Sequence, residues 1–257
     1  MNILAIGDIC GKTGCETVLQ KLPQIKREEK IDLVIANGEN SAEGNGILPS
    51  SADVLFSAGV DVITGGNHTL RRKEIFPLLE ENEFLLRPAN LPNAVPGKGI
   101  TLVDMGYTTV AVISLLGVVS MESMACPFET ADRMIALAEE NGAKLIFVDF
   151  HAEATSEKRA LGFYLDGRVT ALFGTHTHVQ TADEQILPGG SGYITDLGMT
   201  GVKNSVLGVE TEIIIRRMKD KICDKFKNAV GEAELCGCIF GADHKTGRVT
   251  SVKRLRV

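Results

Sequence analysis

Long apolar runs are absent from this chain of 257 residues. None approaches the roughly 18 consecutive apolar residues that a membrane-spanning helix needs. The opening stretch, Met1–Asp8, turns acidic too soon to form the apolar region of a secretory signal. Without such a signal, the six cysteines are expected to be reduced thiols. We therefore expect a cytoplasmic protein with no membrane association.

The chain also has no block of lysine and arginine. Its net charge is −6 and its pI is about 5.5, which argues against a protein that wraps long nucleic acid electrostatically. A small anionic substrate stays open, because bound divalent ions would reverse the local field. The glycine-rich stretch Gly7–Gly14 lacks the spacing of a phosphate-binding loop, so that class of nucleotide site is excluded.

What the chain does have is a regular alternation of strand-like and helix-like segments, typical of an α/β protein. The strands are continuous apolar runs, as in parallel sheets covered on both faces. The signals continue from end to end, which favours one domain over residues 1–257. We expect helices at residues 12–30, 50–59, 72–81, 130–141 and shortly after 153, and strands at 2–7, 32–37, 60–65, 101–104, 109–115, 144–150, 169–174, 185–187, 192–195, 210–217, 233–241 and 247–256.

Five of the apolar runs end in oxygen or nitrogen donors. Carboxylates, carboxamides and imidazoles are the side chains that bind metal ions in hydrolytic sites. Ligands of open α/β sheets sit at the carboxyl ends of the strands, where such groups could meet. The five motifs are Gly7-Asp8, Gly38-Glu39-Asn40, Gly66-Asn67-His68, Asp149-Phe150-His151 and Thr175-His176-Thr177-His178.

The His-Thr-His motif is the most informative of these. If the strand continues through it, His176 and His178 face the same side and can reach one metal or two adjacent ones. Taken singly, the other motifs have ordinary structural explanations. Asp8 could cap a helix, Glu39 and Asn40 could be loop residues, and His151 could be a core histidine.

The order of the motifs resembles that of the calcineurin-like metallophosphoesterases. The amino-acid sequence in and around the motifs is more specific, and it resembles the YmdB-like branch of bacterial phosphodiesterases over essentially the whole chain. The stretches that carry this resemblance are residues 37–42, 87–90, 96–100, 149–158, 174–183 and 193–201.

The resemblance implies a sandwich of two sheets flanked by helices (α/β/β/α), with a dinuclear metal centre at the strand ends. It implies that Asp8, Glu39, Asn40 and His178 hold one ion, and that Glu39, as a bridge, holds the second together with Asn67, His151 and His176. Iron or manganese suits this oxygen and nitrogen set. Zinc is an alternative, which Cys10 would favour if its thiol pointed into the site.

The same resemblance implies a phosphodiesterase that hydrolyses small phosphodiesters, including cyclic nucleotides. A metal-bridged hydroxide would attack phosphorus, and His68 would donate a proton to the leaving group. Two alternatives stay open. One is a metal-dependent nucleotide-binding regulator with weak turnover, and the other is a phosphomonoesterase of the 5′-nucleotidase type.

Some positions depart from the wider superfamily. Cys10 and Ala42 stand where a histidine and an acid are common, and Leu70 and Arg71 where we would expect tryptophan and aspartate. Without an acid at position 42, the group that orients His68 is open. The apolar strands expected late in the chain are compatible with a homo-oligomer.

Overall fold

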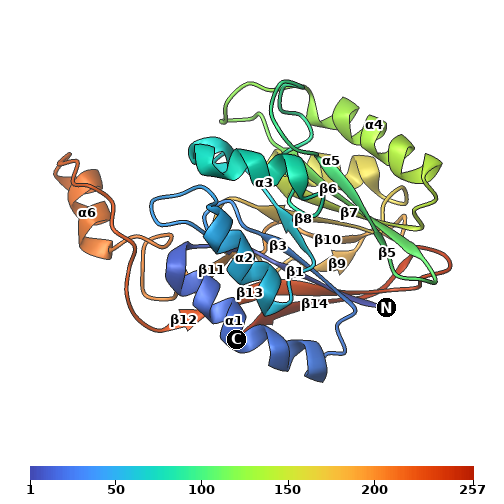
Figure 1. Ribbon diagram of the computed structural model, residues 1–257, viewed down its shortest axis with the longest axis horizontal. Helices are drawn as coiled ribbons and strands as arrows, with labels where there is room; N and C mark the ends of the chain where they lie inside the picture. The colour runs from blue at the N-terminus through green and yellow to red at the C-terminus, as the bar shows by residue number, and fades with distance from the viewer.

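Two β-sheets pack face to face between two layers of helices in the computed structural model, which describes residues 1–257 (Figure 1). Three apolar clusters account for the layers: one under the helices of the first sheet, one between the sheets and one under the helices of the second. The expected α/β class, with a two-sheet sandwich flanked by helices, is confirmed.

The first sheet has the strand order β14-β13-β1-β3-β4. Strands β1, β3 and β4 run parallel, while β13 and β14 add an antiparallel edge. The parallel strands therefore end at one edge, from which the first three motifs emerge. The bounds are β1 Asn2–Ile6, β3 Leu33–Asn37, β4 Val62–Thr64, β13 Cys236–Ala242 and β14 Val249–Arg256.

The second sheet has the order β5-β6-β7-β8-β10-β9. Its four central strands are parallel, and the hairpin expected at residues 101–115 forms the antiparallel pair β5–β6. The bounds are β5 Ile100–Asp104, β6 Thr109–Leu116, β7 Leu145–His151, β8 Ala171–Thr175, β9 Gln185–Ile186 and β10 Gly192–Ile194.

Helices cover the outer face of each sheet (Figure 1). Side chains from α1, α2 and α3 pack on the first sheet, and those from α4 and α5 pack on the second. None of the helices combines the length and apolar character needed to cross a bilayer. The bounds are α1 Gly11–Glu28, α2 Pro49–Ala58, α3 Phe76–Glu81, α4 Pro127–Glu140, α5 Thr155–Leu165 and α6 Thr211–Lys219, with 3-10 turns at Thr69–Arg71 and Lys73–Ile75.

A small third sheet, β12-β11-β2, was not expected. It joins β2 (Asp8–Ile9) to β11 (Met199–Val202) and β12 (Ala233–Glu234). Because Met199 pairs with Asp8, this sheet ties the first motif to a segment almost 200 residues later in the chain. The strand expected at 233–241 is consequently divided at Leu235.

The strand expected at residues 210–217 is wrong, because this segment forms α6. Its run of three isoleucines has the composition of a strand. However, Glu212 lies in the first turn and Arg216, Arg217 and Lys219 in the last, a charge order that stabilises a helix through its macrodipole. The helix lies on an arm that projects from the sandwich (Figure 1). Of the late apolar strands that were compatible with a homo-oligomer, this one is therefore a helix, while the last two form β13 and β14.

The helix expected at 72–81 is also shorter than predicted. One 3-10 turn, Thr69–Arg71, precedes this region, a second, Lys73–Ile75, occupies its start, and the α-helix begins only at Phe76. The first of these turns directly follows His68, and the chain can therefore change direction beside the site.

Aromatic rings join the two sheets at the centre of the sandwich. Phe240 of β13 packs edge-on against Phe147 of β7, with 6.2 Å between ring centroids, and lies 6.1 Å from the ring of Phe173 in β8. All three side chains are buried.

We predict that Phe240→Ala lowers the free energy of unfolding by about 3–5 kcal/mol, because it leaves a cavity between the sheets. Phe163→Ala, at a ring that is 52% exposed, should cost no more than about 1 kcal/mol. Urea unfolding of both variants measures the difference, and equal losses would contradict this account of the core.

Candidate metal centre

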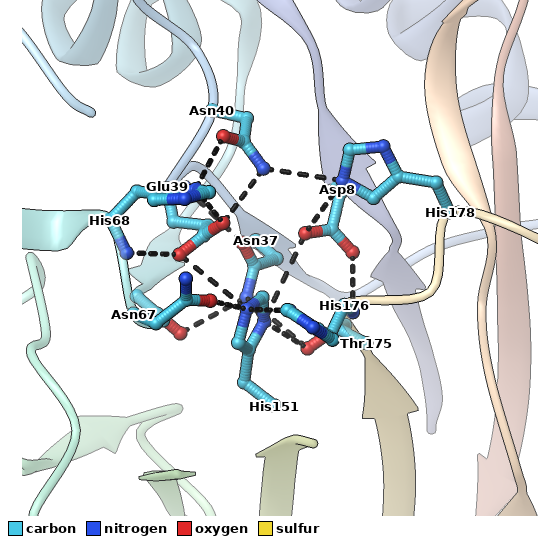
Figure 2. A network of polar contacts seen from close by, with 12 residues as sticks. Asp8, Asn37, Glu39, Asn40, Asn67, His68, His151, Thr175, His176 and His178 are labelled. Carbon is cyan, nitrogen blue, oxygen red and sulfur yellow. Dashed lines mark hydrogen bonds and ion pairs between the residues drawn. The ribbon is translucent and has the colours of Figure 1, made fainter. Parts of the chain in front are cut away.

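All eight side chains expected in the site converge at the carboxyl ends of strands from both sheets (Figure 2). The first sheet contributes three motifs: Asp8 follows β1, Glu39 and Asn40 follow β3, and Asn67 and His68 follow β4. The second sheet contributes His151, the last residue of β7, and the two histidines that follow β8. The rule that ligands bind at strand carboxyl ends predicts this convergence.

Two carboxylates lie at its centre. Asp8 and Glu39 are both fully buried. Asp8 Oδ1 lies 3.5 Å from His178 Nε2, and Glu39 Oε2 lies 3.5 Å from His151 Nε2. Donor atoms of Asp8, Glu39 and His151 all lie within 4.8 Å of one another. Such a cluster of buried donors is the arrangement that a metal ion requires.

The groups that surround these two carboxylates keep them ionised, which suits a bound cation. Burial raises the pKa of Asp8, but His178, His151 and the backbone N–H of His176 lower it by more than burial raises it. The carboxylate therefore stays ionised. Burial likewise raises the pKa of Glu39, and His151 and His68 more than offset it. Asp8 Oδ1 nevertheless accepts no hydrogen bond. A buried anionic oxygen without a donor is costly, and a bound cation would satisfy it.

His151 is held so that one ring nitrogen is free for a ligand role. Its Nδ1 lies 2.9 Å from Thr175 Oγ1, which donates its own proton to Asp149 and therefore accepts from the imidazole. With the proton on Nδ1, the lone pair of Nε2 is available to a ligand, and Nε2 faces the side-chain oxygen of Asn67 at 2.9 Å. Acceptors that face one another in this way favour a cation.

Glu39 and Asn40 orient His68. Its Nδ1 lies 2.9 Å from Glu39 Oε1 and 3.0 Å from Asn40 Oδ1, and its backbone N–H donates to Glu39 Oε2 at 2.7 Å. Because both side-chain neighbours are acceptors, Nδ1 carries a proton and Nε2 is left for a substrate. The group that orients this histidine without an acid at position 42 is therefore identified, and Ala42 is buried.

The expectation that His176 and His178 continue a strand is wrong. Strand β8 ends at Thr175, and the two histidines have φ of +102° and +63°. The chain bends here instead of continuing β8, and residues 176–178 are called the His176–His178 turn. The turn still brings both rings to the site: His178 Nε2 reaches Asp8, and His176 Nδ1 lies 3.0 Å from His151 Nε2. Burial and the neighbouring His151 lower the pKa of His176, which favours the neutral form that binds metals.

The thiol of Cys10 lies outside the donor cluster. Its Sγ is 3.7 Å from His178 Nδ1, the ring nitrogen opposite the one that approaches Asp8. Burial raises the pKa of this thiol, so it stays protonated and contacts the Nδ1 side of the His178 ring. The donor set is thus oxygen and nitrogen, which suits manganese or iron at least as well as zinc.

A buried network beneath the donors was missed. Asp149 accepts hydrogen bonds from Asn37 Nδ2 at 3.0 Å, from Thr64 Oγ1 and from Thr175 Oγ1 at 2.7 Å. Burial raises the pKa of Asp149 to about 6, although these hydrogen bonds oppose the shift. An aspartate inside the otherwise apolar run of β7 was the signal that could have revealed it. The network fixes His151 through Thr175.

Comparison with known proteins assigns the family. The sequence model of the YmdB-like proteins matches residues 4–255. A 2′,3′-cyclic-nucleotide 2′-phosphodiesterase of Bacillus subtilis (strain 168) is 45% identical over 257 residues, covering 100% of this chain and 97% of that protein. The chain belongs to the YmdB-like family. The resemblance seen in the sequence is thereby confirmed. A second relative, a putative phosphatase/phosphodiesterase of Mycoplasma pneumoniae, is 36% identical over 265 residues. The match covers 100% of this chain and 93% of that protein.

Solved structures agree with this assignment. A hypothetical protein of Thermus thermophilus superposes with a TM-score of 0.93 at 39% identity, covering 100% of this chain and 99% of that one. A phosphatase of Mycoplasma pneumoniae gives 0.94 at 35% identity, covering 100% and 93%. A 5′-nucleotidase precursor of Thermus thermophilus gives 0.66 at 13% identity, covering 100% of this chain and 54% of that one. It shares the fold alone. The expected phosphoester-hydrolase class agrees with the names of the family's curated members.

Gly66 tests the metal centre without removing a donor. A Cβ at this position would overlap Glu39 Oε2 and lie 2.5 Å from His151 Nε2, both at side-chain ends. We predict that Gly66→Ala preserves the fold but weakens Mn²⁺ binding at least about tenfold, because both donors must move. Calorimetric titration measures the affinity.

The control is Gly106→Ala, in the β5–β6 turn. Gly106 has φ of +81° and open space around it, so the variant should lose stability from backbone strain and bind Mn²⁺ normally. Unchanged affinity in Gly66→Ala would show that Glu39 and His151 do not share a metal site.

Proposed function

We propose that this protein is a metal-dependent phosphodiesterase that hydrolyses small nucleotide phosphodiesters, with 2′,3′-cyclic nucleotides as its substrate class. The observation that carries the proposal is the buried pair Asp8 and Glu39, with one carboxylate oxygen that accepts no hydrogen bond and with an imidazole 3.5 Å from each carboxylate. The name of the Bacillus relative supports the substrate class. A small anionic diester, rather than long nucleic acid, also suits the acidic chain. We place the reaction in the cytoplasm.

Two divalent cations would be held by this donor set. Asp8, Glu39, Asn40 and His178 form the side of the cluster nearer β2, and Asn67, His151 and His176 form the side nearer β7, with Glu39 in contact with both. Two cations bound there would supply an acidified water as the nucleophile and neutralise charge on the phosphate oxygens.

His68 supplies the proton for the leaving group. The oxygen of water attacks phosphorus and its proton passes to solvent, the bond from phosphorus to the ribose oxygen breaks, and that oxygen takes a proton from His68, which solvent then restores. The geometry supports this role because Glu39 and Asn40 hold Nδ1, and Nε2 faces the half-buried side of the site beside Asn45 Nδ2 at 3.5 Å.

Model and nucleotide esters test the proposed activity. We predict that the manganese-loaded protein hydrolyses 2′,3′-cyclic AMP and bis-p-nitrophenyl phosphate, and that its rate on this diester exceeds its rate on p-nitrophenyl phosphate. A faster rate on the monoester would favour the 5′-nucleotidase alternative. Tight binding of the cyclic nucleotide without product, seen by calorimetry and chromatography, would favour the regulator. Metal content after growth in minimal medium distinguishes manganese, iron and zinc.

Removing His68 should separate proton donation from metal binding. We predict that His68→Ala lowers kcat on 2′,3′-cyclic AMP by about 10²–10⁴-fold. The loss should be smaller on bis-p-nitrophenyl phosphate, because p-nitrophenolate leaves without a proton more easily than a ribose oxygen. Mn²⁺ stoichiometry should be unchanged.

The matched control is His244→Ala, since His244 packs edge-on against Tyr107 in a turn outside the site. This variant should keep wild-type kcat. An equal loss on both substrates in His68→Ala would argue against a proton donor.

A further inference from the structure

An ion pair is fully buried behind the donor cluster. Lys158 of α5 and Asp196, which follows β10, both have an exposed fraction of 0%. Lys158 Nζ lies 2.7 Å from Asp196 Oδ2. Neither residue belongs to the expected site. Burying both charges is expensive, and such a pair is often replaceable by apolar residues without loss of stability. Stability alone is therefore a weak reason for this pair.

The contacts of Asp196 point to a more specific role. Its Oδ2 also accepts the backbone N–H of Thr177 at 3.1 Å, and its Oδ1 accepts that of Gly198 at 2.8 Å. The carbonyl of Gly198 in turn accepts the N–H of Asp8 at 3.0 Å. One carboxylate thus holds the backbone on two sides of the metal centre.

Thr177 is the residue between the two histidines of the turn. Both histidines have positive φ, which is unfavourable for residues that carry a Cβ, and such conformations persist only where surrounding contacts hold them. Asp8 Oδ2 accepts the N–H of His176 at 2.9 Å, and Asp196 accepts the next N–H along the chain. Two carboxylates therefore hold consecutive amides of the turn.

Lys158 donates to Oδ2 of Asp196, the same oxygen that accepts the N–H of Thr177. Its stem passes the backbone of Gly174, where a Cβ would lie 2.9 Å from Lys158 Cδ. A glycine in β8 leaves the space through which the ammonium group reaches Asp196. Lys158 satisfies the charge of a carboxylate that would otherwise have only backbone donors, and links α5 to the turn.

We propose that Lys158 and Asp196 are positioning residues, whose buried ion pair sets the His176–His178 turn in the geometry that binds metal. This inference rests on the metal centre of the proposed function. It assigns a task to two residues that touch neither the metal nor the substrate, and it predicts that metal affinity depends on them beyond their effect on stability.

Three variants separate positioning from stability. Asp196→Asn and Lys158→Met each leave one buried charge unpaired, and each should be destabilised. The double variant removes both charges, so its melting temperature should return towards the wild-type value. Its asparagine side chain has a single acceptor oxygen, however, and cannot accept from both Thr177 and Gly198. The matched control is Leu161→Ala, which removes a buried apolar side chain from the same helix and leaves both charged side chains in place.

Two measurements read the turn directly. Mn²⁺ affinity, by calorimetry, should fall about 10–100-fold in Asp196→Asn and in the double variant. It should be unchanged in Leu161→Ala. Hydrogen exchange of the segment 175–179, followed by mass spectrometry without added metal, should be faster in Asp196→Asn and in the double variant than in Leu161→Ala.

Recovery of Mn²⁺ affinity together with melting temperature in the double variant would overturn the proposal, as would an equal loss of affinity in Leu161→Ala. A wild-type protein that binds no Mn²⁺ would overturn it as well. If the wild type binds Mn²⁺ but hydrolyses no phosphodiester, the proposed activity fails, while the affinity differences between the variants still decide the role of the pair.

Discussion

The structure depends on the burial of two like charges, Asp8 and Glu39, where the two sheets meet. In an apolar sandwich such charges are tolerated only with compensation of opposite sign. Imidazoles from the second sheet supply part of it: His151 and His178 approach these carboxylates to 3.5 Å. One oxygen of Asp8 accepts no hydrogen bond, and a bound cation would complete the compensation. The constraint explains why Asp8 and Glu39 of the first sheet face His151 and His178 of the second.

Beneath the donors, hydrogen bonds turn this electrostatic requirement into a rigid arrangement. Asp149 lies in the second sheet but accepts from Asn37 and Thr64, which end two strands of the first. It also accepts from Thr175, the neighbour of His151. The network therefore joins the two sheets at the strand ends, directly beneath the side chains of the candidate metal centre. Small displacements of one sheet against the other would move His151 relative to Glu39, and the network opposes them.

The sequence predicts most of this architecture because parallel strands buried on both faces are apolar throughout and end in visible polar motifs. It fails where tertiary contacts override local composition. Strands β2 and β11 are too short to have a periodicity, and α6 forms from isoleucines that usually favour strands. The donors were found because each stands at a strand end. The hydrogen bonds that orient them were not, since Asp149 and Thr175 meet through strand pairing that no local spacing encodes.

The donors differ in how they are carried. Asp8, Glu39 and His151 stand on or directly beyond strands whose ladders fix the backbone, whereas His176 and His178 stand on a turn with unfavourable φ. A strained turn keeps its geometry only through contacts outside itself. A different acid supports each kind of donor. Asp149 positions His151 through the hydroxyl of Thr175, and Asp196 holds the turn through the backbone N–H of Thr177. Because Asp196 is itself held by Lys158, the geometry of the second sheet's histidines depends on a helix on the outer face of that sheet. Substitutions in α5 can therefore alter the metal centre without touching it.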